Sequence, residues 1–114
     1  MNSMEEFERD IARELAYVRE ALSTGNTGRA RTAARRAVGC ALKHWLQKHH
    51  HSDYPADMMR QIRRFAAEPQ IPPEIREALL RLEARISTTF ESPSTNPLDD
   101  AVIIISYIRS EAER

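Results

Sequence analysis

Apolar side chains recur at helical spacing along most of the chain and divide it into five predicted helices. In the first, from Ser3 to Leu22, the apolar positions follow one another at spacings of 3, 4, 4, 3 and 4 residues. Such spacing places them in one stripe on a single helix face. Gly25, just beyond, predicts the end of this helix. The stripe consists of Met4, Phe7, Ile11, Leu15, Val18 and Leu22.

An alanine-rich stretch from Thr27 to about His50 predicts the second helix, with Thr27 as its N-cap. Small residues on one face would let a neighbouring helix approach closely, which indicates a central place in a bundle. Gly39 is expected on the opposite, solvent-facing side, where its cost of about 1 kcal/mol is tolerable. The apolar face comprises Ala30, Ala34, Ala37, Val38, Ala41, Leu42 and Trp45.

Three further helices are predicted, from Pro55 to Ala67, from Pro73 to Thr89, and from Asn96 onward. Leu80 points away from the apolar stripe of the second of these. The last segment is also strand-like, because it contains a Val-Ile-Ile-Ile run. Its Asn-Pro start signal and the lack of a second strand candidate favour a helix. As a helix it would be apolar around most of its circumference, and so be central in the bundle or lie at a subunit interface.

These elements predict an all-α fold, a single domain over residues 1–114 built as an up-and-down bundle of four to five helices. The longest apolar run, residues 101–105, is far shorter than the roughly 20 residues of a transmembrane helix. The acidic N-terminus lacks the apolar segment of a signal peptide. The single cysteine, Cys40, suits a reducing compartment. We therefore expect a cytoplasmic protein that does not enter membranes.

Charge changes this picture, because the formal net charge of zero hides a strong segregation. Residues 1–22 carry a net charge of −3, residues 23–52 carry +6, residues 53–70 carry 0 and residues 71–114 carry −3. The basic block contains no acidic residue and coincides with the second predicted helix. Four of its side chains recur every seven residues along the polar face. These four are Arg29, Arg36, Lys43 and His50, and they are flanked by Arg31 and Arg35.

Two interpretations of this basic helix stay open. It binds a nucleotide, RNA or an acidic protein, or it packs internally against the acidic helices. No aromatic residue interleaves the stripe, which disfavours stacking with single-stranded nucleic acid.

The sequence predicts no metal site, cofactor or catalytic residue. His44 and His49 are five residues apart, which is not the i, i+4 spacing that directs two imidazoles at one ion. The single Cys40 excludes a zinc site made of several thiolates. It also lies inside a predicted helix, away from the helix N-terminus that would lower its pKa. The Gly25–Gly28 segment lacks the lysine and the preceding strand of a phosphate-binding loop.

The run from Ala30 to Leu46 resembles the second helix of HEPN domains. There, a line of small residues leads into an Ala-Leu-Lys-x-Leu/Trp-Leu ending, which stands here as Ala41-Leu42-Lys43-His44-Trp45-Leu46. The order of elements that follows is also similar. The resemblance implies an up-and-down bundle that often forms homodimers. It further implies a ribonuclease, a nucleotide- or RNA-binding module, or the partner of a nucleotidyltransferase in a two-component system.

The ribonuclease branch of that family carries an arginine followed, after four to six residues, by a histidine. Here seven residues separate Arg36 from His44, so no catalytic residue carries over. The leading hypothesis is therefore a non-catalytic, HEPN-like domain that binds its ligand or partner through the basic helix. The alternative is a structural bundle with the basic helix packed internally. A ribonuclease using His44 or His49 with Arg35 or Arg36 ranks lowest.

A homodimer is expected as well, because the last helix and Leu80 carry more apolar surface than one bundle core requires. The predicted dimer interface comprises Leu80, Ile103, Ile104 and Tyr107.

Overall fold

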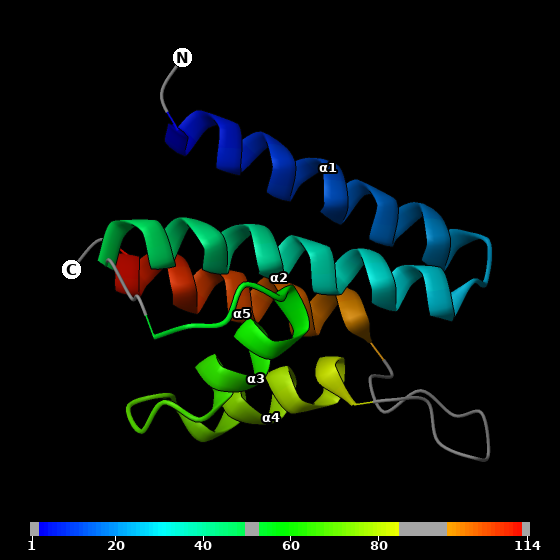
Figure 1. Cartoon of the computed structure of the whole chain (residues 1–114). Coiled ribbons are helices and arrows are strands. Elements are labelled where there is room, and N and C mark those ends of the chain that lie inside the picture. The colour runs from blue at the N-terminus through cyan, green and yellow to red at the C-terminus, as the bar shows by residue number, and fades with distance from the viewer. Residues whose placement is uncertain (1–2, 50–52, 85–95, 113–114) are drawn as a thin grey trace.

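The computed structural model describes residues 3–49, 53–84 and 96–112, which form five helices and no strand (Figure 1). This confirms the all-α prediction, and the strand-like C-terminal segment is a helix. None of the helices in these ranges is both long and apolar enough to cross a membrane. The helices are α1 (Ser3–Ser23), α2 (Thr27–His49), α3 (Met58–Ala66), α4 (Pro73–Glu83) and α5 (Pro97–Ala112).

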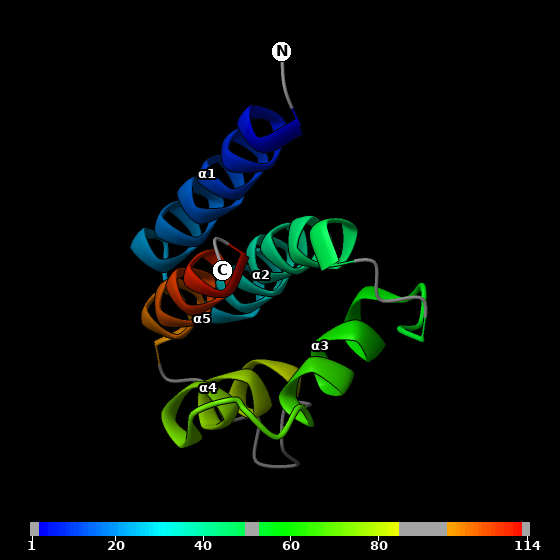
Figure 2. The same cartoon turned by 90° about the vertical axis from the view of Figure 1, so that its left-hand side faces the viewer.

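Helix α2 lies at the centre of the bundle and contacts all four other described helices, most extensively α1 and α5. Helices α1, α2, α4 and α5 alternate in direction, so the arrangement is an up-and-down bundle (Figure 1). The short α3 leads from the end of α2 to α4, and these two helices cover the side of the bundle away from α1 (Figure 2). The predicted central position of the alanine-rich helix is confirmed.

A tight turn joins α1 to α2. The Asn26 N–H donates to the Ala21 carbonyl at 2.8 Å, and the Gly25 N–H donates to the Leu22 carbonyl at 3.1 Å. Gly25 has a φ of 75°, so this is a helix end closed by a left-handed glycine, as the sequence indicated. The N-cap of α2 differs from the prediction. Oδ1 of Asn26, rather than Thr27, accepts the Arg29 backbone N–H at 3.0 Å.

The alanine seam of α2 is fully enclosed, and Gly39, expected to face solvent, is buried too. A β-carbon on Gly39 would lie 2.5 Å from Sδ of Met58 at the start of α3. The lack of a side chain at this position therefore lets α3 approach α2 closely. Helical periodicity misplaced Gly39, because α2 is covered on more sides than its apolar stripe indicates.

An aromatic cluster fixes the C-terminal part of α2 against α3 and α5. The ring of Trp45 lies 5.1 Å from that of Phe65 and 6.0 Å from that of Tyr54, both in edge-on geometry. Phe65 in turn lies 6.3 Å from Tyr107 of α5. Such edge-on pairs add stabilisation beyond the burial of apolar surface.

Helices α3 and α4 are shorter than predicted. Helix α3 begins at Met58 instead of Pro55, because Asp57 is its N-cap and accepts the Arg60 N–H at 2.9 Å. Helix α4 ends at Glu83, because Ala84 adopts an extended conformation with a ψ of 144°. The predicted continuation of α4 to residue 89 falls on residues 85–95, outside the described ranges.

Helix α5 turns one face to the core and leaves the other exposed. Ile104 is completely buried, whereas Val102 and Ile103 are each 39% exposed. The prediction that Ile104 belongs to a dimer interface is therefore wrong, because this side chain is part of the monomer core. Ion pairs hold both ends of the helix, from Asp100 to Arg81 of α4 at 2.7 Å and from Arg109 to Glu8 of α1.

The two adjacent isoleucines of α5 provide a stability test. We expect Ile104→Ala to lower the free energy of unfolding by about 2–5 kcal/mol, because it leaves a cavity in the core. The matched change Ile103→Ala should cost less than about 1 kcal/mol, because that side chain is partly exposed. Urea unfolding of dilute protein, followed by circular dichroism, measures both. Equal losses would contradict the assignment of Ile104 to the core.

Candidate functional site

The structure divides the predicted basic residues of α2 into two groups, and the first group points inward. Nη2 of Arg31 donates to the Arg81 carbonyl at 3.1 Å. Arg35 donates from Nε to the Leu82 carbonyl at 2.6 Å and from Nη2 to the Ala84 carbonyl at 3.1 Å. The last carbonyls of a helix have no partner within the helix, so both arginines cap the C-terminus of α4.

This capping role removes Arg31 and Arg35 from the predicted binding site. Arg31 is only 3% exposed, which leaves it no surface for a ligand. Burial lowers the pKa of both guanidinium groups from their ordinary value. These groups stay protonated at neutral pH, because the ordinary pKa of arginine lies far above that range. Sequence reasoning could not separate them from their neighbours, since their partners lie about fifty residues further along the chain.

The second group remains on the surface and consists of Arg29, Arg36 and Lys43, which we call the α2 basic stripe. These residues are seven apart, so successive members are about 10 Å apart along one helix face. Arg36 forms an ion pair with Glu14 of α1 at 2.5 Å, yet half of its side chain stays exposed. No carboxylate of the described residues pairs with Arg29 or Lys43. The sixth predicted residue, His50, lies outside the described residues.

Two hollows lie beside the stripe, one on each side of the Arg36–Glu14 pair. The first, which we call the Cys40 pocket, has a volume of about 460 Å³. Its wall includes Lys43 and Met58. The second, which we call the Tyr17 hollow, has a volume of about 300 Å³ and is lined by Tyr17 and Arg29 among others. Arg36 lines both hollows.

Residues of α1 and of the segment leading into α3 join this surface, and the sequence did not single them out. Tyr17 is 46% exposed and lines the same hollow as Arg29, so an aromatic residue does stand beside the stripe, contrary to expectation. It was missed because the helical pattern compares residues within one helix, whereas Tyr17 belongs to α1 and the stripe to α2. In the sequence, the one indication that Tyr17 is exposed was its position outside the apolar stripe of α1.

Carboxylates alternate with the cations on this surface. Glu14 is buried beside Arg36, and Glu20 lines the Tyr17 hollow. Asp10 forms an ion pair with Arg13 at 2.9 Å, and Arg13 lines the Cys40 pocket. Around the two hollows, four cations therefore stand against these three carboxylates, which gives mixed charge with a small positive excess.

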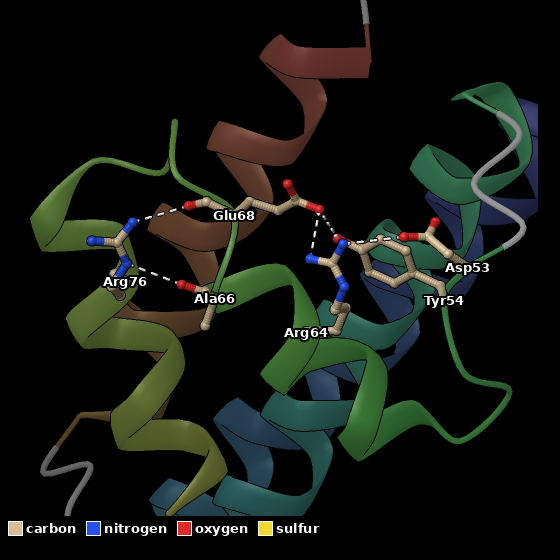
Figure 3. Close-up of polar contacts among 6 residues, drawn as sticks. All are labelled: Asp53, Tyr54, Arg64, Ala66, Glu68 and Arg76. Atoms are coloured by element: carbon tan, nitrogen blue, oxygen red, sulfur yellow. Dashed lines mark hydrogen bonds and ion pairs between the residues drawn. The ribbon is translucent and has the colours of Figure 1, made fainter.

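A polar network positions the segment that closes the Cys40 pocket (Figure 3). The carboxylate of Glu68 accepts the Tyr54 hydroxyl at 2.8 Å and Nη1 of Arg64 at 3.0 Å. Arg64 also pairs with Asp53 at 3.1 Å. Burial and the hydrogen bond to Glu68 raise the pKa of Tyr54 well above its ordinary range, so its hydroxyl stays protonated.

Two further contacts fix the ends of this segment. Arg76 of α4 donates to the carbonyls of Ala66 and Glu68 at 3.0 and 2.9 Å, which ties the end of α3 to α4 (Figure 3). The side-chain amide of Gln61 donates to the Pro55 carbonyl at 2.8 Å, which holds the turn before α3. The part of the pocket wall formed by Ala56, Met58 and Gln61 is therefore fixed from both sides.

Cys40 is half-buried on the floor of the pocket that carries its name. Burial raises the pKa of its thiol, and the negative charges of Asp10 and Glu14 raise it further. The thiolate is the nucleophilic form, so this cysteine is not activated at neutral pH. This agrees with the sequence-based expectation that Cys40, inside a helix, has no helix N-terminus to lower its pKa.

The histidines of α2 make aromatic contacts. The ring of His44 lies 4.8 Å from that of Phe7, and the ring of His49 lies 5.2 Å from that of Trp45. Among the residues that the structure describes, no three histidine, cysteine or acidic side chains are grouped so that they could hold a metal ion.

No family model, curated protein or solved structure matches this chain. The interpretation of the site therefore depends on its own geometry.

The capping arginines can be tested against a surface arginine of the same helix. We expect Arg35→Met to lower the free energy of unfolding by about 1–3 kcal/mol, because it removes charged donors from two carbonyls at the end of α4. Arg29→Met should change it by less than about 0.5 kcal/mol, because no side-chain partner is lost. Urea unfolding measures both values. A loss for Arg29→Met as large as that for Arg35→Met would contradict the division of the basic residues.

Proposed function

We propose that this chain is a non-catalytic interaction module that binds an acidic segment of a partner protein. The binding surface is formed by α1 and the α2 basic stripe. The observation that carries the proposal is the alternation of exposed cations with hollows along one edge of the bundle. Arg29 and Lys43 would pair with carboxylates of the partner, and the two hollows would accept its apolar side chains.

The make-up of the surface favours a protein over a nucleic acid. Binding to phosphates requires a marked excess of cations, because affinity arises mainly from neutralising successive phosphates. Glu14 and Glu20 lie within this surface, and a phosphate chain, which carries a charge on every nucleotide, would place negative charge beside them. A peptide can place its carboxylates at Arg29 and Lys43 and uncharged side chains beside the two glutamates. Arginine, tyrosine and methionine are enriched in protein–protein interfaces, and the surface presents Arg29, Tyr17 and Met58.

The surroundings of the residues considered for catalysis support a binding role. Arg35 already uses two side-chain donors, Nε and Nη2, on the carbonyls of Leu82 and Ala84. The pKa of the Cys40 thiol is raised rather than lowered. An HEPN-like membership and a cytoplasmic location stay part of this proposal as predictions from the sequence.

The test uses a short fluorescent peptide in which glutamate alternates with leucine and serine. We expect saturable binding that weakens with salt, because exposed ion pairs are screened. Arg29→Gln with Lys43→Gln should weaken it about five- to tenfold, corresponding to two exposed ion pairs. Fluorescence anisotropy measures the affinity.

The matched control, Arg19→Gln with Lys48→Gln, also removes two charges but at residues that line neither hollow, and it should bind like the wild type. Mixed-sequence single-stranded RNA and ATP serve as competing probes. The proposal fails if the peptide binds the wild type, the Arg29/Lys43 variant and the Arg19/Lys48 variant with equal affinity. It also fails if RNA binds more tightly than the peptide and loses affinity in the Arg29/Lys43 variant, which would favour the nucleic-acid alternative.

We further propose that the chain forms a homodimer through the exposed face of α5. Val102 and Ile103 are adjacent, apolar and each 39% exposed on that face. Of the predicted interface, Leu80 is 46% exposed and Tyr107 is partly buried against the core, while Ile104 takes no part. The revised interface therefore centres on the exposed pair of α5.

Light scattering during gel filtration at tens of micromolar protein tests the dimer. We expect the wild type to elute as a dimer and Ile103→Lys as a monomer, because a buried unpaired charge opposes association. Tyr17→Lys is the control, since Tyr17 is similarly exposed but lies on α1. A wild-type monomer, or a dimer that persists with Ile103→Lys, would refute this interface.

A further inference from the structure

The Cys40 pocket combines an apolar floor with a cationic rim. Its floor is formed by Gly39 and Cys40 of α2, and its far wall by Ala56 and Met58. Because Gly39 has no side chain, Met58 lies directly against the helix and contributes its apolar thioether. The volume of about 460 Å³ falls in the range of small-molecule sites, roughly 300–1,000 Å³.

The polar groups of the pocket differ in whether they are already occupied. Arg36 is paired with Glu14, and Arg13 with Asp10. The side-chain amide of Gln61 is bonded to the carbonyls of Pro55 and Ala56.

Lys43 is the exception among the cations that line the pocket. In the described part of the chain, no carboxylate pairs with its ammonium group. An ammonium at the rim of an apolar pocket attracts an anion. Because Glu14 and Asp10 balance the two arginines, Lys43 provides the net positive charge of the pocket. The pocket thus offers one unoccupied ionic contact beside an apolar surface.

We propose that the Cys40 pocket binds a small amphipathic organic anion. Its apolar body lies on Met58, Ala56 and the half-buried Cys40, and its single acidic group pairs with Lys43. A ligand with several negative charges fits less well, because the buried carboxylate of Glu14 also lines the pocket. This site does not require the protein partner proposed above, since its walls all come from this chain.

The probe for this site is anilinonaphthalene sulfonate, which joins an apolar aromatic body to one sulfonate. Its uncharged analogue, phenylnaphthylamine, has a similar body without the acidic group. We expect the sulfonate to bind saturably, with one site per chain and enhanced fluorescence. Lys43→Gln should weaken its binding about fivefold and leave the binding of the uncharged analogue unchanged. Lys48→Gln, on the same helix but outside the pocket, is the matched control.

Cys40 provides an independent readout, because it is the only cysteine of the chain. Saturating sulfonate probe should slow its alkylation by iodoacetamide at least threefold, as followed by mass spectrometry. Ala56→Trp, which fills the pocket from an exposed position, should abolish both the fluorescence and the protection. It should leave the urea unfolding midpoint nearly unchanged.

The site assignment is overturned if the probe binds without protecting Cys40, or if Ala56→Trp binds it as well as the wild type does. It is also overturned if Lys43→Gln and Lys48→Gln bind it with equal affinity. These outcomes involve no peptide, so they are independent of the peptide measurements that test the proposed function.

Discussion

The charge of the central helix constrains most of this structure. Helix α2 contacts every other described helix, yet it carries six lysine and arginine side chains and no acidic one. A cation removed from water requires an ionic or hydrogen-bonding partner, because burial of an unpaired charge costs several kcal/mol. The carbonyl end of α4 provides that partner for Arg31 and Arg35, and Glu14 of the acidic α1 provides it for Arg36. The cations that these neighbours do not reach remain at the exposed edge.

Much of the fold could be predicted from the sequence, because the apolar residues of a helix with one buried face recur every three or four positions. The stripe of α1 and the Asn-Pro start of α5 gave their elements almost to the residue. The pattern was less informative where other helices cover a helix on several sides. Gly39 and Ile104 were both misplaced for this reason, since spacing shows that a residue can be buried but not what covers it. The end of α4 at Glu83 depends on the backbone conformation of Ala84, for which the pattern holds no signal.

The candidate site was predicted only in part, again because the sequence pattern does not show which helices lie beside a given residue. A seven-residue spacing correctly placed Arg29, Arg36 and Lys43 on one face of α2. The separation of these residues from Arg31 and Arg35 depends on the position of α4, whose capped carbonyls are distant in sequence. The role of Tyr17 depends on how α1 is rotated against α2. Both are tertiary relations, and a pattern read along one helix contains neither.

The sequence left two interpretations of the basic helix open, and the structure places its basic side chains in two different environments. Arg31 is buried and Arg35 is partly buried, and both donate to carbonyls of α4, whereas Arg29 and Lys43 are exposed. Arg36 combines the two environments, because it pairs with Glu14 and also lines the hollows on either side of that pair. An anionic group bound in either hollow would draw on the same guanidinium and weaken its pairing with Glu14. Under the proposals above, anionic groups in the two hollows would therefore compete for Arg36. An apolar occupant would leave the Arg36–Glu14 pair intact and would not affect the other hollow.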